Sequence, residues 1–110
     1  MKNKTIVVPI DDKAKIALDY DNATPEQLME VVLSDAEFKV LWDTGFFELI
    51  NKIADVNIDD YEDEGIEDKE KLGKVLASDI FTASAIDSVN HIKSLFEEAL
   101  KRETGIYFYF

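Results

Sequence analysis

The sequence predicts an α+β domain in which an N-terminal β-hairpin and a C-terminal strand form a small antiparallel sheet against three to five α-helices. Three observations support this fold class. Residues 5–10 form a β-branched run typical of a strand, and the last five residues are aromatic or β-branched. Helix-start signals and helical periodicity occupy much of the region between them. At 110 residues without cysteine, the chain is expected to form one domain, 1–110, without disulfides.

Residues 1–20 are expected to form the hairpin. Its first strand is the run 5–10, where Pro9 favours an edge or a bulge. Its second strand is predicted at 15–20, because apolar side chains alternate there with other residues, as in a half-buried strand. The intervening residues 11–14 would form the turn.

Residues 24–54 are expected to be helical. Thr24 and Gln27 form a potential capping box around Pro25, which predicts a helix start, and Ser34 and Glu37 form a second one. The region therefore reads as two or three short helices. Its aromatic side chains recur at helical spacing and are assigned to the core, with one of the adjacent pair Phe46 and Phe47 expected at the surface; the set is Phe38, Trp42, Phe46 and Phe47.

The longest helical periodicity covers residues 67–103 and predicts either one long helix or two helices with a break near 82–85. Residues 106–110 come next as a strand that is aromatic on both faces. Such a strand is either buried on both faces or pairs with a partner, so a homodimer through 106–110 is one possibility.

Negative charge is concentrated in the middle of the chain. Residues 1–20 carry a net charge of +1, residues 21–68 carry −13 and residues 69–110 carry zero, which sum to −12. The densest part is the acidic segment, residues 55–68, in which eight of fourteen residues are acidic: Asp55, Asp59, Asp60, Glu62, Asp63, Glu64, Glu67 and Asp68. A block of like charge is usually a solvated, solubilising surface.

The functional interpretation is that the acidic segment imitates a phosphate backbone. Eight phosphates of one DNA strand span about 25 Å. Fourteen residues span about 21 Å as a helix and about 46 Å when extended. The imitation therefore requires a compactly folded segment. We expect these eight carboxylates to contact the nucleic-acid site of a basic protein, and the chain to act as a non-enzymatic inhibitor. In its general character the chain resembles small phage or mobile-element proteins of the anti-restriction or anti-CRISPR type.

Two alternatives remain open at the sequence level. The first is a protein-interaction or structural module, possibly a homodimer, whose acidic segment only confers solubility. The second is a divalent-cation binder at 55–59, where Asp55, Asn57 and Asp59 match three EF-hand positions; Asp60 stands where the loop requires glycine.

Other classes are disfavoured. With one histidine, no cysteine and no strained nucleophile turn, no catalytic or metal-binding residue is assigned, no cofactor is expected, and an enzyme is the least favoured class. A pI near 4.3 argues against direct binding to nucleic acid. No apolar window is long enough to span a membrane and no secretory signal is present, so a cytoplasmic location is expected.

Overall fold

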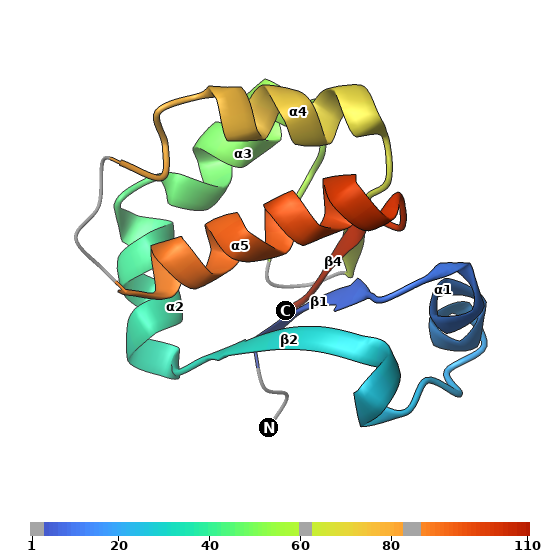
Figure 1. The fold of residues 1–110 in the computed structure, drawn as a ribbon. Coiled ribbons are helices and arrows are strands. Elements are labelled where there is room, and N and C mark those ends of the chain that lie inside the picture. Colours follow the sequence, from blue (N-terminus) through green and yellow to red (C-terminus); the bar gives the residue numbers. More distant parts are fainter. Residues whose placement is uncertain (1–3, 60–62, 83–86) are drawn as a thin grey trace.

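The computed structural model describes residues 4–59, 63–82 and 87–110, which form a four-stranded antiparallel sheet and five α-helices (Figure 1). The elements are β1 (Lys4–Pro9), α1 (Asp12–Asp19), the 3₁₀ turn η1 (Pro25–Gln27), β2 (Leu28–Leu33), α2 (Asp35–Asp43), α3 (Phe46–Ala54), β3 (Glu64–Ile66), α4 (Lys69–Ala77), α5 (Asp87–Arg102) and β4 (Ile106–Tyr109). The strand order is β2-β1-β4-β3. The predicted α+β class is confirmed.

The sheet separates a helix-covered face from a more open one. Figure 1 shows α5 lying across the sheet with α3 and α4 beyond it, and α1 at one end. Strand register places Ile6 beside both Val31 and Phe108, and these side chains belong to the core under the helices. The residues between them point to the other face, because successive side chains of a strand alternate.

The strand predicted at 15–20 is wrong, because residues 15–19 belong to α1 and Tyr20 is its C-cap. Asp11 caps this helix, its carboxylate accepting the Ala14 amide at 2.7 Å. Ala14 is fully buried, whereas Ile16 and Tyr20 are 58% and 74% exposed. The apparent alternation therefore did not mark a buried strand face. In its place β2 pairs with β1, so the two strands are separated by a helix instead of forming a hairpin.

The helix predicted to begin at Pro25 is also wrong. Thr24 and Gln27 do form the capping box, but it opens only the single turn η1. The chain then continues as β2, where Val31 and Val32 favour an extended backbone and six residues pair with β1. A capping box specifies one turn, and here strand pairing determines the conformation of the residues beyond that turn.

The second capping box behaves as predicted. The Ser34 hydroxyl accepts the Glu37 amide at 3.1 Å, and the Glu37 carboxylate accepts the Ser34 amide at 3.0 Å, at the start of α2. A new helix, α3, begins after Gly45. Both Phe46 and Phe47 are buried, contrary to the expectation that one would surface, because Phe46 packs on Phe81 while Phe47 packs on Phe110.

The region 67–103 contains two helices, which confirms the second of the two predicted arrangements. The first, α4, ends at Ala77, earlier than the predicted break at 82–85, most of which lies outside the described residues. The Ser78 hydroxyl donates to the Val75 carbonyl at 2.5 Å just beyond the last turn. Ile80 and Phe81 then turn into the core, and the apolar side chain of Ile80 extended the helical pattern past the real helix end.

The strand predicted at 106–110 is present as β4, and it lies inside the sheet. It pairs with β1 on one side and with β3 on the other. Pairing with a second molecule through the backbone of β4 is therefore blocked. A dimer that involves 106–110 would have to use the side chains on the open face.

Candidate functional site

The first half of the acidic segment is attached to α3 by one asparagine. The Asn51 side chain accepts the Ile58 amide at 2.7 Å and donates to the Ile58 carbonyl at 3.0 Å, while its backbone carbonyl accepts the Val56 amide at 3.1 Å. Ile58 is 1% exposed and belongs to the core. This end of the segment is therefore fixed by hydrogen bonds and by apolar burial.

The second half is attached to the sheet. Glu64 and Ile66 are the ends of β3, which pairs with β4. The Glu64 carboxylate accepts the Asn57 amide at 3.1 Å, so it also links the two halves of the segment. The fold-back between Asn57 and Glu64 makes the described part of the acidic segment compact, which is the condition that phosphate imitation requires.

Several predicted contact residues have internal partners. Asp68 caps α4 and accepts the Glu70 amide at 2.8 Å. Glu67 accepts a hydrogen bond from the Tyr107 hydroxyl and forms a salt bridge with Lys15 at 3.4 Å. These carboxylates, together with Glu64, shape the segment and are less available to a partner than the sequence suggests.

The remaining predicted residues divide between the surface and the part of the chain that is not described. Asp55 is exposed and adopts a left-handed backbone, with φ of 54°, at the C-cap of α3. Asp59 is half-buried and Asp63 is exposed. Asp60 and Glu62 lie outside the described residues.

The open face of the sheet brings further acids together. We define this open face by cross-strand neighbours: Val7 lies beside Glu30 and Tyr107, and Thr5 lies beside Val32 and Tyr109. A groove of about 610 Å³ runs over it, lined by Thr5, Val7, Leu18, Asp21, Leu28, Glu30, Asp63 and Tyr109. Every charged residue in this lining is an acid.

The pKa values of Tyr107 and Tyr109, the two tyrosines of the open face, are both raised in part by nearby carboxylates. Burial raises the pKa of Tyr109 above its ordinary value, and the nearby carboxylates of Asp63, Asp19 and Asp21 raise it further. Burial also raises the pKa of Tyr107, as do its hydrogen bond to Glu67 and the charges of Glu67 and Asp19. Carboxylates from separate stretches of the chain thus converge around one pair of rings.

The contribution of Asp19, Asp21 and Glu30 to this face is not evident from the sequence. These residues precede the acidic segment by at least 25 positions. The pairing of β1 with β2 and β4 brings Glu30 to this face, and Asp19 and Asp21 reach it from the end of α1. Glu30 carried one usable signal, since it is the single charged residue in an otherwise apolar strand. A charge at that position marks the strand face that the core does not cover.

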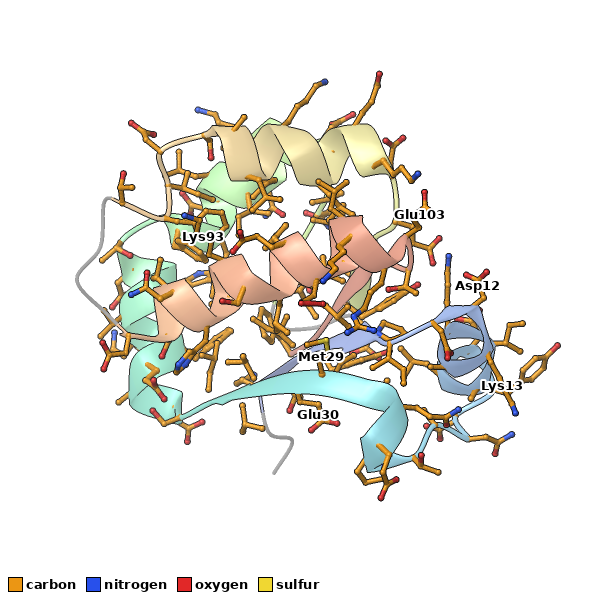
Figure 2. The ribbon with its side chains drawn as sticks, viewed as in Figure 1. Asp12, Lys13, Met29, Glu30, Lys93 and Glu103 are labelled. Atoms are coloured by element: carbon orange, nitrogen blue, oxygen red, sulfur yellow. The ribbon has the colours of Figure 1, made fainter. Side chains whose placement is uncertain are left out.

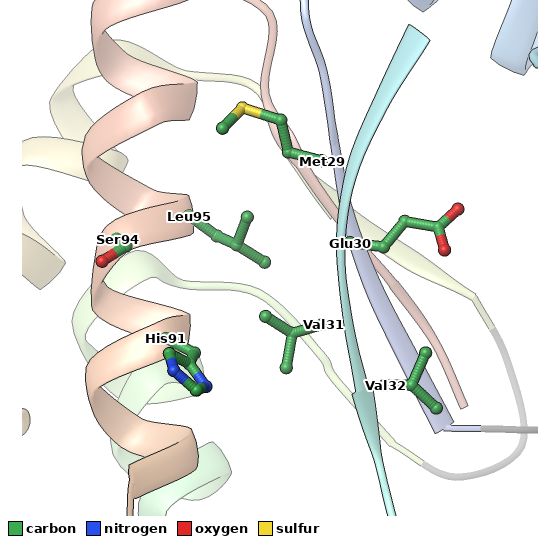
Figure 3. A pocket seen from close by; sticks show the side chains of 7 residues that line it. All are labelled: Met29, Glu30, Val31, Val32, His91, Ser94 and Leu95. Atoms are coloured by element: carbon green, nitrogen blue, oxygen red, sulfur yellow. The ribbon is translucent and has the colours of Figure 1, made fainter. Parts of the chain in front are cut away.

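A second groove runs along the outer edge of β2. It has a volume of about 620 Å³ and is lined by Met29, Glu30, Val31, Val32, His91, Ser94 and Leu95. Figure 2 shows Met29 and Glu30 pointing to opposite sides of β2. In Figure 3, Met29 and Val31 point toward α5, whereas Glu30 and Val32 point away from it. This edge groove therefore has an apolar side and an acidic side.

Two arrangements that sequence chemistry could suggest are not formed in the part of the chain that the structure describes: a pair of Ser88 with His91, and a carboxylate cluster for a metal ion. The Ser88 hydroxyl donates to Glu37, so it is not paired with His91 as a nucleophile with a base. Within the described ranges, no three carboxylate or histidine side chains are grouped to hold a metal ion, and this includes Asp55 and Asp59 of the predicted cation site.

Comparison with protein-family models, with curated proteins and with solved structures found no match to this chain. None of the described helices combines the length and the apolar character needed to cross a membrane.

Proposed function

We propose that this protein is a non-enzymatic inhibitor that occupies the nucleic-acid site of a basic protein. One observation carries the proposal: carboxylates from Asp19, Asp21, Glu30 and Asp63 converge on the open face, beside an acidic segment that is anchored at both ends. A phosphate backbone is recognised by Lys and Arg through charge at fixed positions. Fixed carboxylates can meet the same side chains.

The rigidity of the scaffold supports this role over simple solubilisation. A solubilising loop needs no defined conformation. Here the Asn51 side chain makes two hydrogen bonds to one loop residue, Ile58, which is also buried. Holding in place the backbone that carries the carboxylates reduces the ordering cost of association. The proposed class is the anti-defence type of phage or mobile-element inhibitor, acting in the cytoplasm.

The composition of the open face also suits Lys and Arg. Tyr109 lines the groove together with Asp63 and Asp21, and a cation gains from both a carboxylate and a ring face. The apolar stems of Lys and Arg can rest on Leu18 and Leu28, which are half-buried in the same groove. Such binding is fast at low ionic strength and weakens as salt screens the charges.

The proposal is tested by competition with DNA. Basic proteins from a bacterial lysate are retained on the immobilised chain at low salt, released at high salt, purified and titrated with duplex DNA. We expect the chain and the DNA to exclude one another from each retained protein. Polyglutamate of equal total charge is the control, and it should compete more weakly because its carboxylates are not fixed. Simultaneous binding of chain and DNA would overturn the proposal.

A structural module, possibly a homodimer, is the second candidate. The observation in its favour is that the open face exposes Val32, at 56%, and carries the half-buried Tyr109 on the other side of Thr5. Two copies joined there would bring like charges together, which opposes association at low salt. Light scattering distinguishes the two candidates. A dimer that persists at low salt would favour the structural module, and a monomer would favour the inhibitor.

A further inference from the structure

The outer edge of β2 has backbone amide and carbonyl groups that are not paired with a described strand. β2 ends the strand order, and Figure 1 shows it along the border of the sheet with no described strand beyond it. The Ile10 amide donates to the Gln27 carbonyl at 3.0 Å, which identifies 27 as a residue bonded toward β1. Because bonding alternates along an antiparallel strand, 29, 31 and 33 also face β1, and the backbone groups of Glu30 and Val32 face outward.

This edge carries little of the usual protection against strand addition. Natural edge strands are commonly short or bulged, or they carry Pro or charged residues, Lys above all. β2 is six residues long, it contains neither Lys nor Pro, and it pairs with β1 in an unbroken register from Leu28 to Leu33. Its one charged residue, Glu30, repels an acidic segment but attracts a basic one. Val32, on the edge itself, is 56% exposed. The edge is therefore ready to accept a further strand.

The chemistry on the two sides of the edge defines what that strand must be. Toward α5, an added side chain would enter the space between Val31 and Leu95, which is apolar (Figure 3). Toward the open face, the next side chain would lie near Glu30 and, across the groove, Asp21. Since side chains of a strand alternate, the preferred segment alternates apolar with basic residues.

We infer that β2 binds an extended segment of the basic partner by strand addition, with apolar side chains in the edge groove and Lys or Arg over the open face. This inference rests on the proposed function, because it takes the partner to be a basic protein. Main-chain hydrogen bonds supply affinity in this mode, and alternate side chains supply specificity. A second copy of this chain is a poorer occupant, since it would extend the same acidic face and bring together two molecules that each carry −12.

The test uses the full chain and two synthetic peptides of about eight residues, the length of an ordinary strand. One peptide alternates valine and lysine, and its isomer has the valines and lysines in separate blocks. We expect the alternating peptide to bind about tenfold more tightly or better. Two further versions of the alternating peptide carry N-methyl groups, one on the odd and the other on the even backbone nitrogens. Only one of these two versions should lose the preference, because only one alternating set of amides bonds to the edge strand.

Two tryptophan variants on α5 locate the binding. Ser94→Trp fills the edge groove, whereas Asn90→Trp adds the same ring at an exposed position that does not line it. The preference should disappear in S94W and persist in N90W. Equal, salt-sensitive binding of both peptides would overturn strand addition while leaving the proposed charge recognition intact. If neither peptide binds at low salt, both strand addition and the proposed charge recognition are overturned. A dimer dissociated by S94W would make a second copy the occupant and overturn the inference.

Discussion

The hydroxyl of Tyr107, on β4, donates a hydrogen bond to the carboxylate of Glu67, the first residue after β3. Lys15 of α1 reaches the same carboxylate at 3.4 Å. One predicted contact residue is thus held between a strand and a helix, and the acidic segment continues directly from the sheet. This contact gives the open face a defined edge and has a measurable pH signature.

Tyr107→Phe should change the stability of the protein at alkaline pH. The folded-state pKa of Tyr107 is raised, so the folded protein keeps the phenolic proton while the unfolded chain loses it above about pH 10. The raised pKa therefore contributes its full stabilisation of the folded state below about pH 10, and this stabilisation is lost as the pH rises above that value. Y107F should cost about 1 kcal/mol near neutrality and reduce the alkaline loss, as measured by urea unfolding between pH 7 and 11.

Tyr20→Phe is the control for this measurement. It removes the same hydroxyl from a tyrosine that lies at the surface, since Tyr20 is 74% exposed. An alkaline profile for Y107F that runs parallel to that of the unmodified protein would contradict the role assigned to the Tyr107–Glu67 contact.

Glu37→Gln should affect the acid side of the stability profile. The Ser88 hydroxyl and the Ser34 amide both donate to the Glu37 carboxylate and hold its pKa below the ordinary value. Stabilisation from a lowered pKa is present above the unfolded-state value, near 4.3, and is lost as pH falls below it. E37Q should therefore have a lower melting temperature than the unmodified protein at pH 7, and its melting temperature should fall less when the pH is lowered. Glu48→Gln, at an exposed position on α3, should leave the acid profile unchanged.

Gly65→Ala should destabilise the strand that anchors the acidic segment. A Cβ added at Gly65 would lie 2.7 Å from Cδ1 and 2.8 Å from Cε1 of the Tyr107 ring, so the ring must move. Overpacking of this kind costs about 1–3 kcal/mol. Gly73→Ala is the matched control: Gly73 is within α4, a Cβ there meets open space, and the change should stabilise by about 0.5–1 kcal/mol. Equal effects of the two variants in denaturant unfolding would contradict the close packing of β3 on β4.

Asn51→Ala should release the first half of the acidic segment. It removes both side-chain hydrogen bonds to Ile58 and leaves a buried amide without its acceptor, at a cost of about 1–3 kcal/mol. Amide hydrogen exchange should accelerate at Ile58, and partner binding should weaken because the carboxylates lose their fixed positions. Asn90→Ala, on the exposed side of α5, should change neither. Unaltered exchange in N51A would show that the segment is held by something else.

Short sequence patterns, such as capping boxes, correctly predicted the conformation of the residues that form them but not always that of the residues that follow. The Ser34–Glu37 box correctly predicted α2, and the aromatic run 106–110 correctly predicted a strand. The Thr24–Gln27 box also formed, yet the pairing of β2 with β1 replaced the helix expected after it. Residues 15–20 were misread because an eight-residue helix holds too few turns for its period to be distinguished from alternation.

The candidate site was predictable in part. The acidic segment is evident from composition, and its compactness depends on Asn51, which no charge pattern identifies. The convergence of Asp19, Asp21 and Glu30 on the open face depends on the strand order, which places β2 and β4 on either side of β1, and on the position of α1. Linear charge density cannot encode that arrangement. It also does not reveal that the carboxylates of Glu64, Glu67 and Asp68 bond within the protein.

The central claim, that the open face binds a basic protein, is tested most directly by two charge-matched double variants. Asp19→Lys with Glu30→Lys alters the open face, since Glu30 lines its groove and the charge of Asp19 acts on Tyr107 and Tyr109. Glu48→Lys with Glu97→Lys makes the same change in net charge at exposed helix positions that neither line this groove nor act on these rings. The measurement is the Kd for the DNA-competing protein retained at low salt. We expect the open-face pair to weaken binding by about 100-fold or more and the control pair by less than about tenfold. Equal losses from both pairs, or no loss from the first, would contradict the claim.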